Sequence, residues 1–147
     1  MKKIFFLTAA SLILSLGSPL ISLSAIPINC DQQEEVFGFQ IPSYTTQHEG
    51  APIINIKVSY RYMPNAIIKN DYPDFVPIRK DIETFIANYP NHTDFWEIVN
   101  KKLVQFILNK YPQLSSLMVK IDVSNQAFPR FSVIRSTRPQ ACPLTIP

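Results

Sequence analysis

Strict alternation of apolar and polar residues predicts two strands in this chain. In the clearest stretch, residues 54–62, every second residue is apolar: Ile54, Ile56, Val58, Tyr60 and Tyr62. Residues 117–123 repeat the pattern, with the following residues on one side: Leu117, Val119, Ile121 and Val123. A period of two places the apolar side chains of a strand on one face. Both segments therefore predict half-buried strands of an antiparallel sheet with one wet face.

Two shorter segments predict the remaining strands. In residues 36–41 the aromatic and aliphatic residues fall on one side, and residues 42–50 follow as a polar loop that contains His48. His48 is expected to be exposed there. Residues 131–137 form a more mixed strand near the C-terminus. Strands are therefore expected towards both ends of the chain.

The middle of the chain has the spacing of two amphipathic helices. Asp74 is a good N-cap for the first, and Pro77 falls in its first turn, where the missing N–H is harmless. Pro90 stops this helix. Its apolar residues recur every three or four positions: Ile78, Ile82, Phe85 and Tyr89.

The second helix starts after Thr93 or Asp94 and ends at Tyr111. Asp94 and Glu97 have the spacing of a capping box, in which two side chains satisfy free N–H groups at the helix start. A broad apolar stripe follows: Trp96, Val99, Leu103, Phe106 and Ile107. Such a stripe is typical of a helix that packs on a core.

The predicted elements come in the order strand, strand, helix, helix, strand, strand. Strands at both ends with helices between them are typical of the α+β class. We predict an antiparallel β-sheet with two helices packed on one face. The sequence has no repeats, low-complexity segments or internal linker, so residues 26–147 form one domain.

Residues 1–25 have the order of a cleavable export signal. Two lysines precede an apolar run over residues 4–16, and small residues stand before a cut after Ala25. The alternative is an uncleaved anchor, but crossing a bilayer takes about 20 apolar residues and this run is shorter. We expect a secreted or periplasmic protein with no stable membrane span after the signal is removed.

Export changes the meaning of the two cysteines. Cys30 lies near the start of the mature chain and Cys142 near its end. In an oxidising compartment they are expected to form one disulfide that ties the two ends together. The rival interpretations are two free thiols, or a cysteine nucleophile paired with His48 or His92, for which no local signature is present.

Composition and charge exclude several classes of function. The chain has 147 residues and a net charge of +3, with 14 Lys and Arg against 11 Asp and Glu. Two of those lysines lie in the signal, which contains no acidic residue, so the mature charge is +1. This gives no basis for nucleic-acid binding. Three glycines exclude a Gly-rich phosphate loop, and the two His and two distant Cys make no zinc motif. We expect no cofactor and no metal.

The element order and its local motifs resemble the tunnelling fold, and are most like the C-terminal half of dihydroneopterin aldolase. In that enzyme a Tyr opens the first helix. An apolar pair followed by Glu opens the second, and a strand and a turn follow. The segment that carries the resemblance runs from Tyr72 to Ile134 and covers about half of the mature chain. Within it, the matching motifs are Tyr72, Phe95-Trp96-Glu97, Val119 to Val123, and Ser124 to Pro129.

The resemblance implies a ligand site. In tunnelling-fold enzymes, a Glu at the start of the second helix accepts hydrogen bonds from a ring N–H and an amino group of a pterin or purine, at a site between subunits. Glu97 matches that position, with Tyr72 and Trp96 as further ligand-binding candidates. A carboxylate offers two oxygens to two parallel donors. Alternatively, Glu97 only caps its helix or complements the helix dipole, and Trp96 belongs to the core.

One departure from the family concerns catalysis. The aldolase uses a Lys just before a Pro, in the turn after the third strand, for proton transfer. The corresponding residues here are Ser124 and Asn125. A hydroxyl cannot carry a proton at neutral pH as a tuned ammonium can, so aldolase chemistry is not expected. Lys120 is near in sequence, but the alternation places it on the wet side of its strand.

Three hypotheses about function follow. The first is an exported protein that binds a planar heterocycle or a protein partner through an interface between identical subunits, without catalysis. The second is a divergent pterin- or purine-handling enzyme, which uses Glu97, Tyr72 and His48. The third is a periplasmic interaction domain stapled by the disulfide between Cys30 and Cys142.

Overall fold

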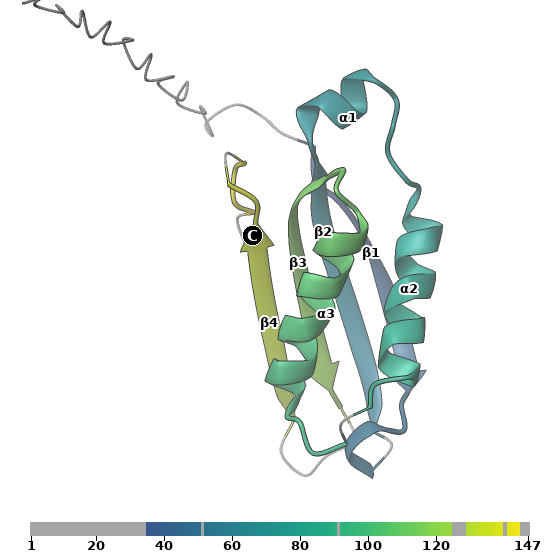
Figure 1. Cartoon of the computed structure of the whole chain (residues 1–147). Coiled ribbons are helices and arrows are strands. Elements are labelled where there is room, and N and C mark those ends of the chain that lie inside the picture. Colours follow the sequence, from purple (N-terminus) through teal and green to yellow (C-terminus); the bar gives the residue numbers. More distant parts are fainter. Residues whose placement is uncertain (1–34, 51, 91, 125–128, 140, 145–147) are drawn as a thin grey trace, which may run out of the picture.

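A computed structural model describes residues 35–50, 52–90, 92–124, 129–139 and 141–144, and within them one antiparallel sheet carries the fold (Figure 1). Its strand order is the chain order: β1 (Phe37–Thr45), β2 (Ile53–Tyr62), β3 (Leu114–Val123) and β4 (Arg130–Thr137). Two helices cover one face: α2 (Phe75–Ala87) and α3 (Trp96–Lys110). The predicted α+β class and the ββααββ order are confirmed.

The core lies between the sheet and the two helices. The alternate residues Ile54, Ile56 and Val58 of β2 are at most 1% exposed. They face apolar residues of the helices that are equally buried: Ile78 and Ile82 of α2, and Val99, Leu103 and Ile107 of α3. Each such side chain stabilises the fold by about 1.5–3 kcal/mol through its burial. The apolar residues that recur with a period of two in the strands and about 3.6 in the helices are therefore the residues that form the core.

The start of α2 is as predicted. Asp74 is its N-cap, and the Asp74 carboxylate accepts a hydrogen bond of 2.6 Å from the Phe75 N–H. Pro77 lies in the first turn, and the helix ends at Ala87, before Pro90. A short helix that the pattern did not predict, α1 (Pro64–Ile68), joins β2 to the loop before α2.

The predicted capping box at the second helix is wrong. The N-cap of α3 is Phe95, which makes no side-chain cap hydrogen bond. The Asp94 carboxylate instead accepts a hydrogen bond of 2.5 Å from the Tyr89 hydroxyl and pairs with the Lys102 ammonium at 2.8 Å. Because these two donors hold the carboxylate, α3 starts one residue later than the spacing predicts, and Glu97 is the second residue of the helix.

The first strand runs further than predicted. The polar loop was expected from residue 42, but β1 continues to Thr45 and pairs with β2 through Ile53. The register shifts between Ile41 and Tyr44, where Ser43 has a φ of 52° and its N–H donates to the Asn55 side chain. Pro42 lies within this bulge of an edge strand. Proline is tolerated at such positions because no ladder hydrogen bond needs its missing N–H, so the strand continues beyond it.

The C-terminal segment lies against the sheet face that carries no helix. This helix-free face bears the outward residues of each strand, among them Arg61 of β2 and Arg135 of β4. Arg61 donates to the Pro143 carbonyl at 3.0 Å, and Arg135 donates to the Leu144 carbonyl at 3.1 Å. Cys142 is only 4% exposed. Its predicted partner, Cys30, lies outside the described residues, as does the predicted export signal over residues 1–25.

Candidate functional site

The three residues expected at the ligand site fall at two ends of the sheet. Tyr72 lies at the end of β2, where its ring centroid is 4.8 Å from that of Tyr62. Trp96 lies beyond the start of β2, with its ring 4.9 Å from that of His48. The ten residues of β2 separate the two places by about 30 Å. One chain therefore brings Glu97 and Trp96 together, but not Tyr72.

Glu97 stands exposed in the first turn of α3. None of the described residues makes a hydrogen bond or an ion pair with its carboxylate. The side chains beside it are apolar and open to solvent: Phe95 is 60% exposed and Ile98 is 41% exposed. Because Glu97 takes no part in a capping box, its carboxylate can accept two hydrogen bonds from a ligand.

Trp96 belongs to the core. It is 1% exposed and its indole packs edge-on against the His48 ring. Its Nε1 has no hydrogen-bond partner among the described residues. A buried ring has no free face on which a planar ligand could stack, so Trp96 can act only by supporting the turn that carries Glu97.

His48 was expected in an exposed loop, and this expectation is wrong. It is 3% exposed, within a short 3-10 helix (His48–Gly50). Its Nε2 lies 2.7 Å from the Asp94 carbonyl oxygen, and its ring meets the Tyr89 and Trp96 rings edge-on. The neighbouring Glu49 pairs with Arg130 of β4. Residues 40 or more positions away in sequence bury His48, which no local pattern could indicate.

Two similar ion clusters flank the contact between α2 and α3, one within the helices and one between α3 and the loop that precedes it. Asp94 binds Tyr89 and Lys102, as described above. Asp81 of α2 pairs with Lys110 at 2.7 Å and also accepts a hydrogen bond from the Tyr111 hydroxyl. Each cluster therefore contains one aspartate, one tyrosine and one lysine.

The Lys102 hydrogen bond lowers the pKa of Asp94, and the Asp94 hydrogen bond raises the pKa of Lys102 to about 12. Burial, followed by the Asp94 hydrogen bond, raises the pKa of Tyr89. Every member of this cluster therefore titrates far from neutral pH. Its groups suit structural contacts and not proton transfer at pH 7.

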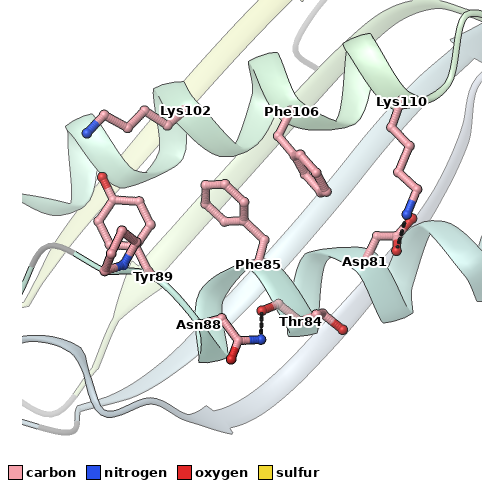
Figure 2. Close-up of a pocket in the computed structure, with 9 residues that line it drawn as sticks. Asp81, Thr84, Phe85, Asn88, Tyr89, Lys102, Phe106 and Lys110 are labelled. Carbon is pink, nitrogen blue, oxygen red and sulfur yellow. Dashed lines mark hydrogen bonds and ion pairs between the residues drawn. The ribbon is translucent and has the colours of Figure 1, made fainter.

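A groove of about 470 Å³ runs between these clusters, on the outer side of α2 and α3 (Figure 2). Phe85 and Phe106 stack across it, with ring centroids 5.2 Å apart. Lys102 lies 5.4 Å from the Tyr89 ring centroid, and Lys110 lies 5.9 Å from that of Phe106. The chain's own ammonium groups therefore already interact with these rings. This interhelical groove is primarily a helix-packing contact.

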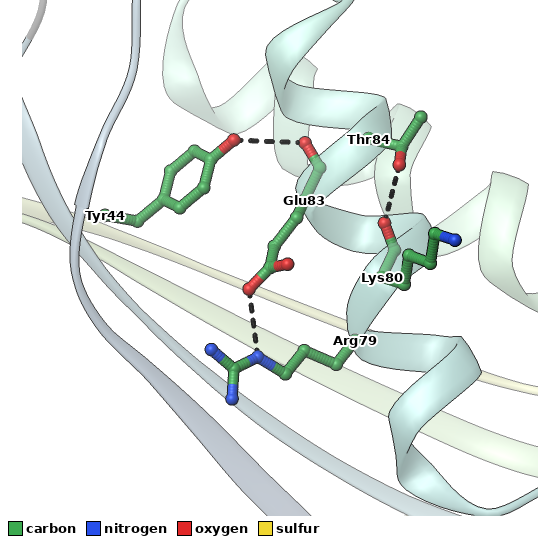
Figure 3. Close-up of polar contacts among 5 residues, drawn as sticks. All are labelled: Tyr44, Arg79, Lys80, Glu83 and Thr84. Atoms are coloured by element: carbon green, nitrogen blue, oxygen red, sulfur yellow. Dashed lines mark hydrogen bonds and ion pairs between the residues drawn. The ribbon is translucent and has the colours of Figure 1, made fainter.

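The opposite side of α2 is tied to the edge strand β1 (Figure 3). The Tyr44 hydroxyl donates to the Glu83 carbonyl at 3.2 Å, and the Glu83 carboxylate pairs with Arg79 at 2.9 Å. Among the described residues on this side, these contacts form no cluster with catalytic geometry.

A second cavity, of about 390 Å³, lies beside Tyr72. Five aromatic rings and one carboxylate line it together with two small residues: Phe37, Tyr60, Tyr62, Tyr72, Phe75, Asp74, Gly38 and Pro73. We call this cavity the aromatic pocket. The sequence pattern assigned Tyr60 and Tyr62 to the core, where they are indeed buried. The pattern could not indicate that their ring edges also line an opening, because the loop over residues 72–75 creates it.

Ser124 replaces the aldolase lysine and has a structural role. Its hydroxyl donates to the Ile53 carbonyl at 3.2 Å and accepts from the Asn55 amide nitrogen at 3.3 Å. Lys120 pairs with Asp122 at 2.9 Å. It lies on the helix-free face, as the alternation predicted. Asn125 lies outside the described residues.

Among the described residues, no group of three or more His, Cys, Asp or Glu side chains could hold a metal ion. None of the described helices has the length and apolar character needed to cross a membrane.

Comparison with known proteins supports the fold assignment. No protein-family model matches the sequence, and no curated protein matches it. The structure is similar to the crystal structure of a Vibrio cholerae O1 biovar El Tor protein assigned as a dihydroneopterin aldolase (FolB), with a TM-score of 0.53. The match covers 73% of this chain and 100% of that one, at 11% sequence identity. The chain has a tunnelling fold. At this identity the similarity shows the fold alone, and the tunnelling fold does not determine a reaction.

Proposed function

We propose that this protein is exported and binds a planar heterocycle of the pterin or purine kind at an interface between subunits, without aldolase catalysis. The observation that carries the proposal is the exposed carboxylate of Glu97 at the start of α3, with which none of the described residues pairs. The resemblance in sequence matches Glu97 to the position at which tunnelling-fold enzymes bind such rings, and this match supports the proposal. Export is supported by the signal-like residues 1–25.

The surroundings of Glu97 suit a flat, partly apolar ligand. Phe95 and Ile98 flank the carboxylate and are 60% and 41% exposed. A heterocycle with an amino group beside a ring N–H would present two parallel donors to the two carboxylate oxygens. Its ring would cover the apolar side chains at the same time.

A complete site needs two copies of the chain. Tyr72 lies about 30 Å from Glu97 along β2, so a ligand that contacts Glu97 of one copy can meet Tyr72 only from another. Both edges of the sheet, β1 and β4, carry no further strand among the described residues. Unpaired edges allow copies to associate through backbone hydrogen bonds.

Near the position that matches the aldolase lysine, the described residues provide no free proton carrier. Ser124 is engaged by Ile53 and Asn55, and Lys120 is held by Asp122 on the helix-free face. The second hypothesis, an enzyme using Glu97, Tyr72 and His48, is weakened by the burial of His48 and the distance of Tyr72. The first hypothesis requires the exposed Glu97 carboxylate and a second copy of the chain, but neither His48 nor a proton carrier.

The test uses protein purified after expression of the full chain. Its mass in solution and its thermal unfolding are measured with a panel of pterins and purines. We expect an oligomer stabilised by at least one heterocycle, with the shift lost in Glu97→Gln. Glu83→Gln is the matched control, because Glu83 is an α2 surface carboxylate paired only with Arg79.

Three results would contradict the proposal. A monomer unaffected by every heterocycle would leave only an interaction domain. Retention of the thermal shift in Glu97→Gln would remove the carboxylate from the site. Turnover of a stabilising pterin would favour the divergent enzyme.

A further inference from the structure

The aromatic pocket differs from the interhelical groove in its charge. The three lysine–ring contacts among the described residues involve Tyr89, Phe106 and Phe131, and none of these rings lines the aromatic pocket. The pocket contains no basic residue and one acidic residue, Asp74. Its ring faces therefore have no positive partner within the described chain.

The rings form a continuous wall. Tyr62 stands at its centre, with ring centroids 4.8 Å from Tyr72, 5.1 Å from Phe37 and 5.4 Å from Tyr60. Tyr60 and Tyr62 are 3% and 6% exposed and form the floor, whereas Tyr72 and Phe75 are 41% and 42% exposed and form the rim. The cavity thus has an aromatic floor in the protein and an aromatic rim that solvent reaches.

Asp74 gives the pocket a negative charge. One carboxylate oxygen caps α2 through the Phe75 N–H, and the other has no hydrogen-bond partner among the described residues. The Asp74 charge also acts on the two tyrosines of the pocket floor. Burial raises the pKa of Tyr60 and of Tyr62, and the Asp74 charge adds to both shifts. A carboxylate beside neutral phenol rings creates a negative potential at the electron-rich ring faces.

We propose that the aromatic pocket binds a small organic cation of the quaternary ammonium class. The faces of aromatic rings attract such cations, and a nearby carboxylate adds a longer-range attraction. A methylated ammonium needs no hydrogen-bond acceptors, which suits a floor in which the Tyr62 hydroxyl already donates to the Pro73 carbonyl. A volume of about 390 Å³ is also within the range of small-molecule sites.

This site is independent of Glu97. It is formed by β1, β2 and the loop before α2 of a single chain, at the opposite end of β2 from the proposed heterocycle site. Tyr72 is the residue that the two proposed sites share, because a second copy would bring it to the heterocycle site. Glu97→Gln should abolish heterocycle binding and leave choline binding unchanged, so failure of one proposal is distinguishable from failure of the other.

The test measures choline binding by titration calorimetry, at low salt, to protein purified after expression of the full chain. The reference compound is the uncharged carbon isostere, in which a tert-butyl group replaces the trimethylammonium group. We expect saturable choline binding, about tenfold tighter than binding of the isostere. No saturable binding, or equal binding of the two compounds, would overturn the proposal.

Two pairs of variants locate the site. Asp74→Asn removes the charge but keeps a good N-cap, so α2 is retained. It should weaken choline binding about threefold or more, while Asp71→Asn, in the exposed loop before it, should not. Tyr72→Leu removes an exposed ring and should weaken binding about threefold to tenfold, and Tyr72→Phe should restore it. Thermal unfolding verifies that each variant is folded. Unchanged affinity in both Asp74→Asn and Tyr72→Leu would exclude this pocket.

Discussion

At the scale of single residues, two aspartates fasten the helix pair. Asp81 and Asp94 each bind one tyrosine hydroxyl and one lysine ammonium, at the two ends of the interhelical groove. The partner of Asp81 that lies furthest in sequence, Tyr111, is 30 positions away. The Asp81 contacts join α2 to the end of α3, and the Asp94 contacts join the loop between the helices to α3, both at the edge of the apolar core to which Tyr89 and Tyr111 belong.

Replacing Asp81 tests one of these clusters through its pH dependence. Partial burial opposes the change, but hydrogen bonds from Lys110 and Tyr111 lower the pKa of Asp81 below its ordinary value of 3.8. A lowered folded-state pKa stabilises the protein above that value, and this contribution is lost as the pH falls through the folded-state pKa. Asp81→Asn should therefore be less stable than the wild type at pH 7, by about 1 kcal/mol or less because solvent screens the pair.

Urea unfolding of both proteins from pH 7 to pH 2 measures the effect. The stability difference should shrink below pH 3.8. Asp71→Asn, which changes a loop carboxylate, is the control and should follow the wild type. A difference that stays constant with pH would show that packing, and not charge, sets the Asp81 effect.

His48 and Tyr62 mark the limit of local sequence patterns at this scale. Polarity placed His48 in a wet loop, yet Asp94 and Trp96 bury it. Alternation placed Tyr62 in the core correctly, but it could not indicate that Tyr72 and Asp74 would leave a cavity against its ring. In both cases the decisive neighbours come from another element, so the information is absent from the local pattern.

At the scale of elements, one buried amide attaches α3 to the sheet. Asn100 is 0% exposed, and its amide nitrogen donates to the Val119 carbonyl of β3 at 2.9 Å and to the Ser132 carbonyl of β4 at 3.3 Å. The Ser132 hydroxyl lies 3.2 Å from the same nitrogen. Apolar packing allows a helix to slide on a sheet, whereas these directional bonds favour one position.

Removing this amide should cost stability. Asn100→Ala leaves the Ser132 hydroxyl without its α3 partner and opens space under the helix, so we expect a loss of about 1–3 kcal/mol in the free energy of unfolding. Urea unfolding at neutral pH measures it. Asn109→Ala, on the exposed side of the same helix, is the matched control and should change stability far less. Equal effects of the two substitutions would contradict this role.

The elements themselves were largely predictable, because the apolar residues that repeat along each element are the same residues that the core buries. The alternation in β2 and β3 and the apolar stripes of α2 and α3 gave strands and helices that the structure confirms. Apart from the short helix α1, which the pattern did not predict, the errors lie at the ends of elements. Pro42 suggested a stop, but a bulge carries β1 past it. Asp94 suggested a cap, but Tyr89 and Lys102 hold its carboxylate.

At the scale of the whole molecule, the two faces of the sheet are covered differently. Helices bury one face, while part of the helix-free face lies under the C-terminal segment, held through Arg61 and Arg135. Buried Cys142 and Leu144 belong to this segment. The four strands are held by ladders of hydrogen bonds. The C-terminal segment is attached more weakly, through arginine side chains that donate to its backbone carbonyls. A covalent link to the start of the mature chain would strengthen it.

We therefore expect a disulfide between Cys30 and Cys142, and this prediction can be tested in the whole protein. Thiol titration of the denatured, unreduced protein should find no free thiol. Closing so long a loop contributes about 4 kcal/mol in the chain-entropy model, so a reductant should lower the urea midpoint clearly. The double variant Cys30→Ala/Cys142→Ala is the control, because its midpoint should be low already and insensitive to the reductant. Two titratable thiols in the wild type, or a midpoint that the reductant leaves unchanged, would contradict the expected link.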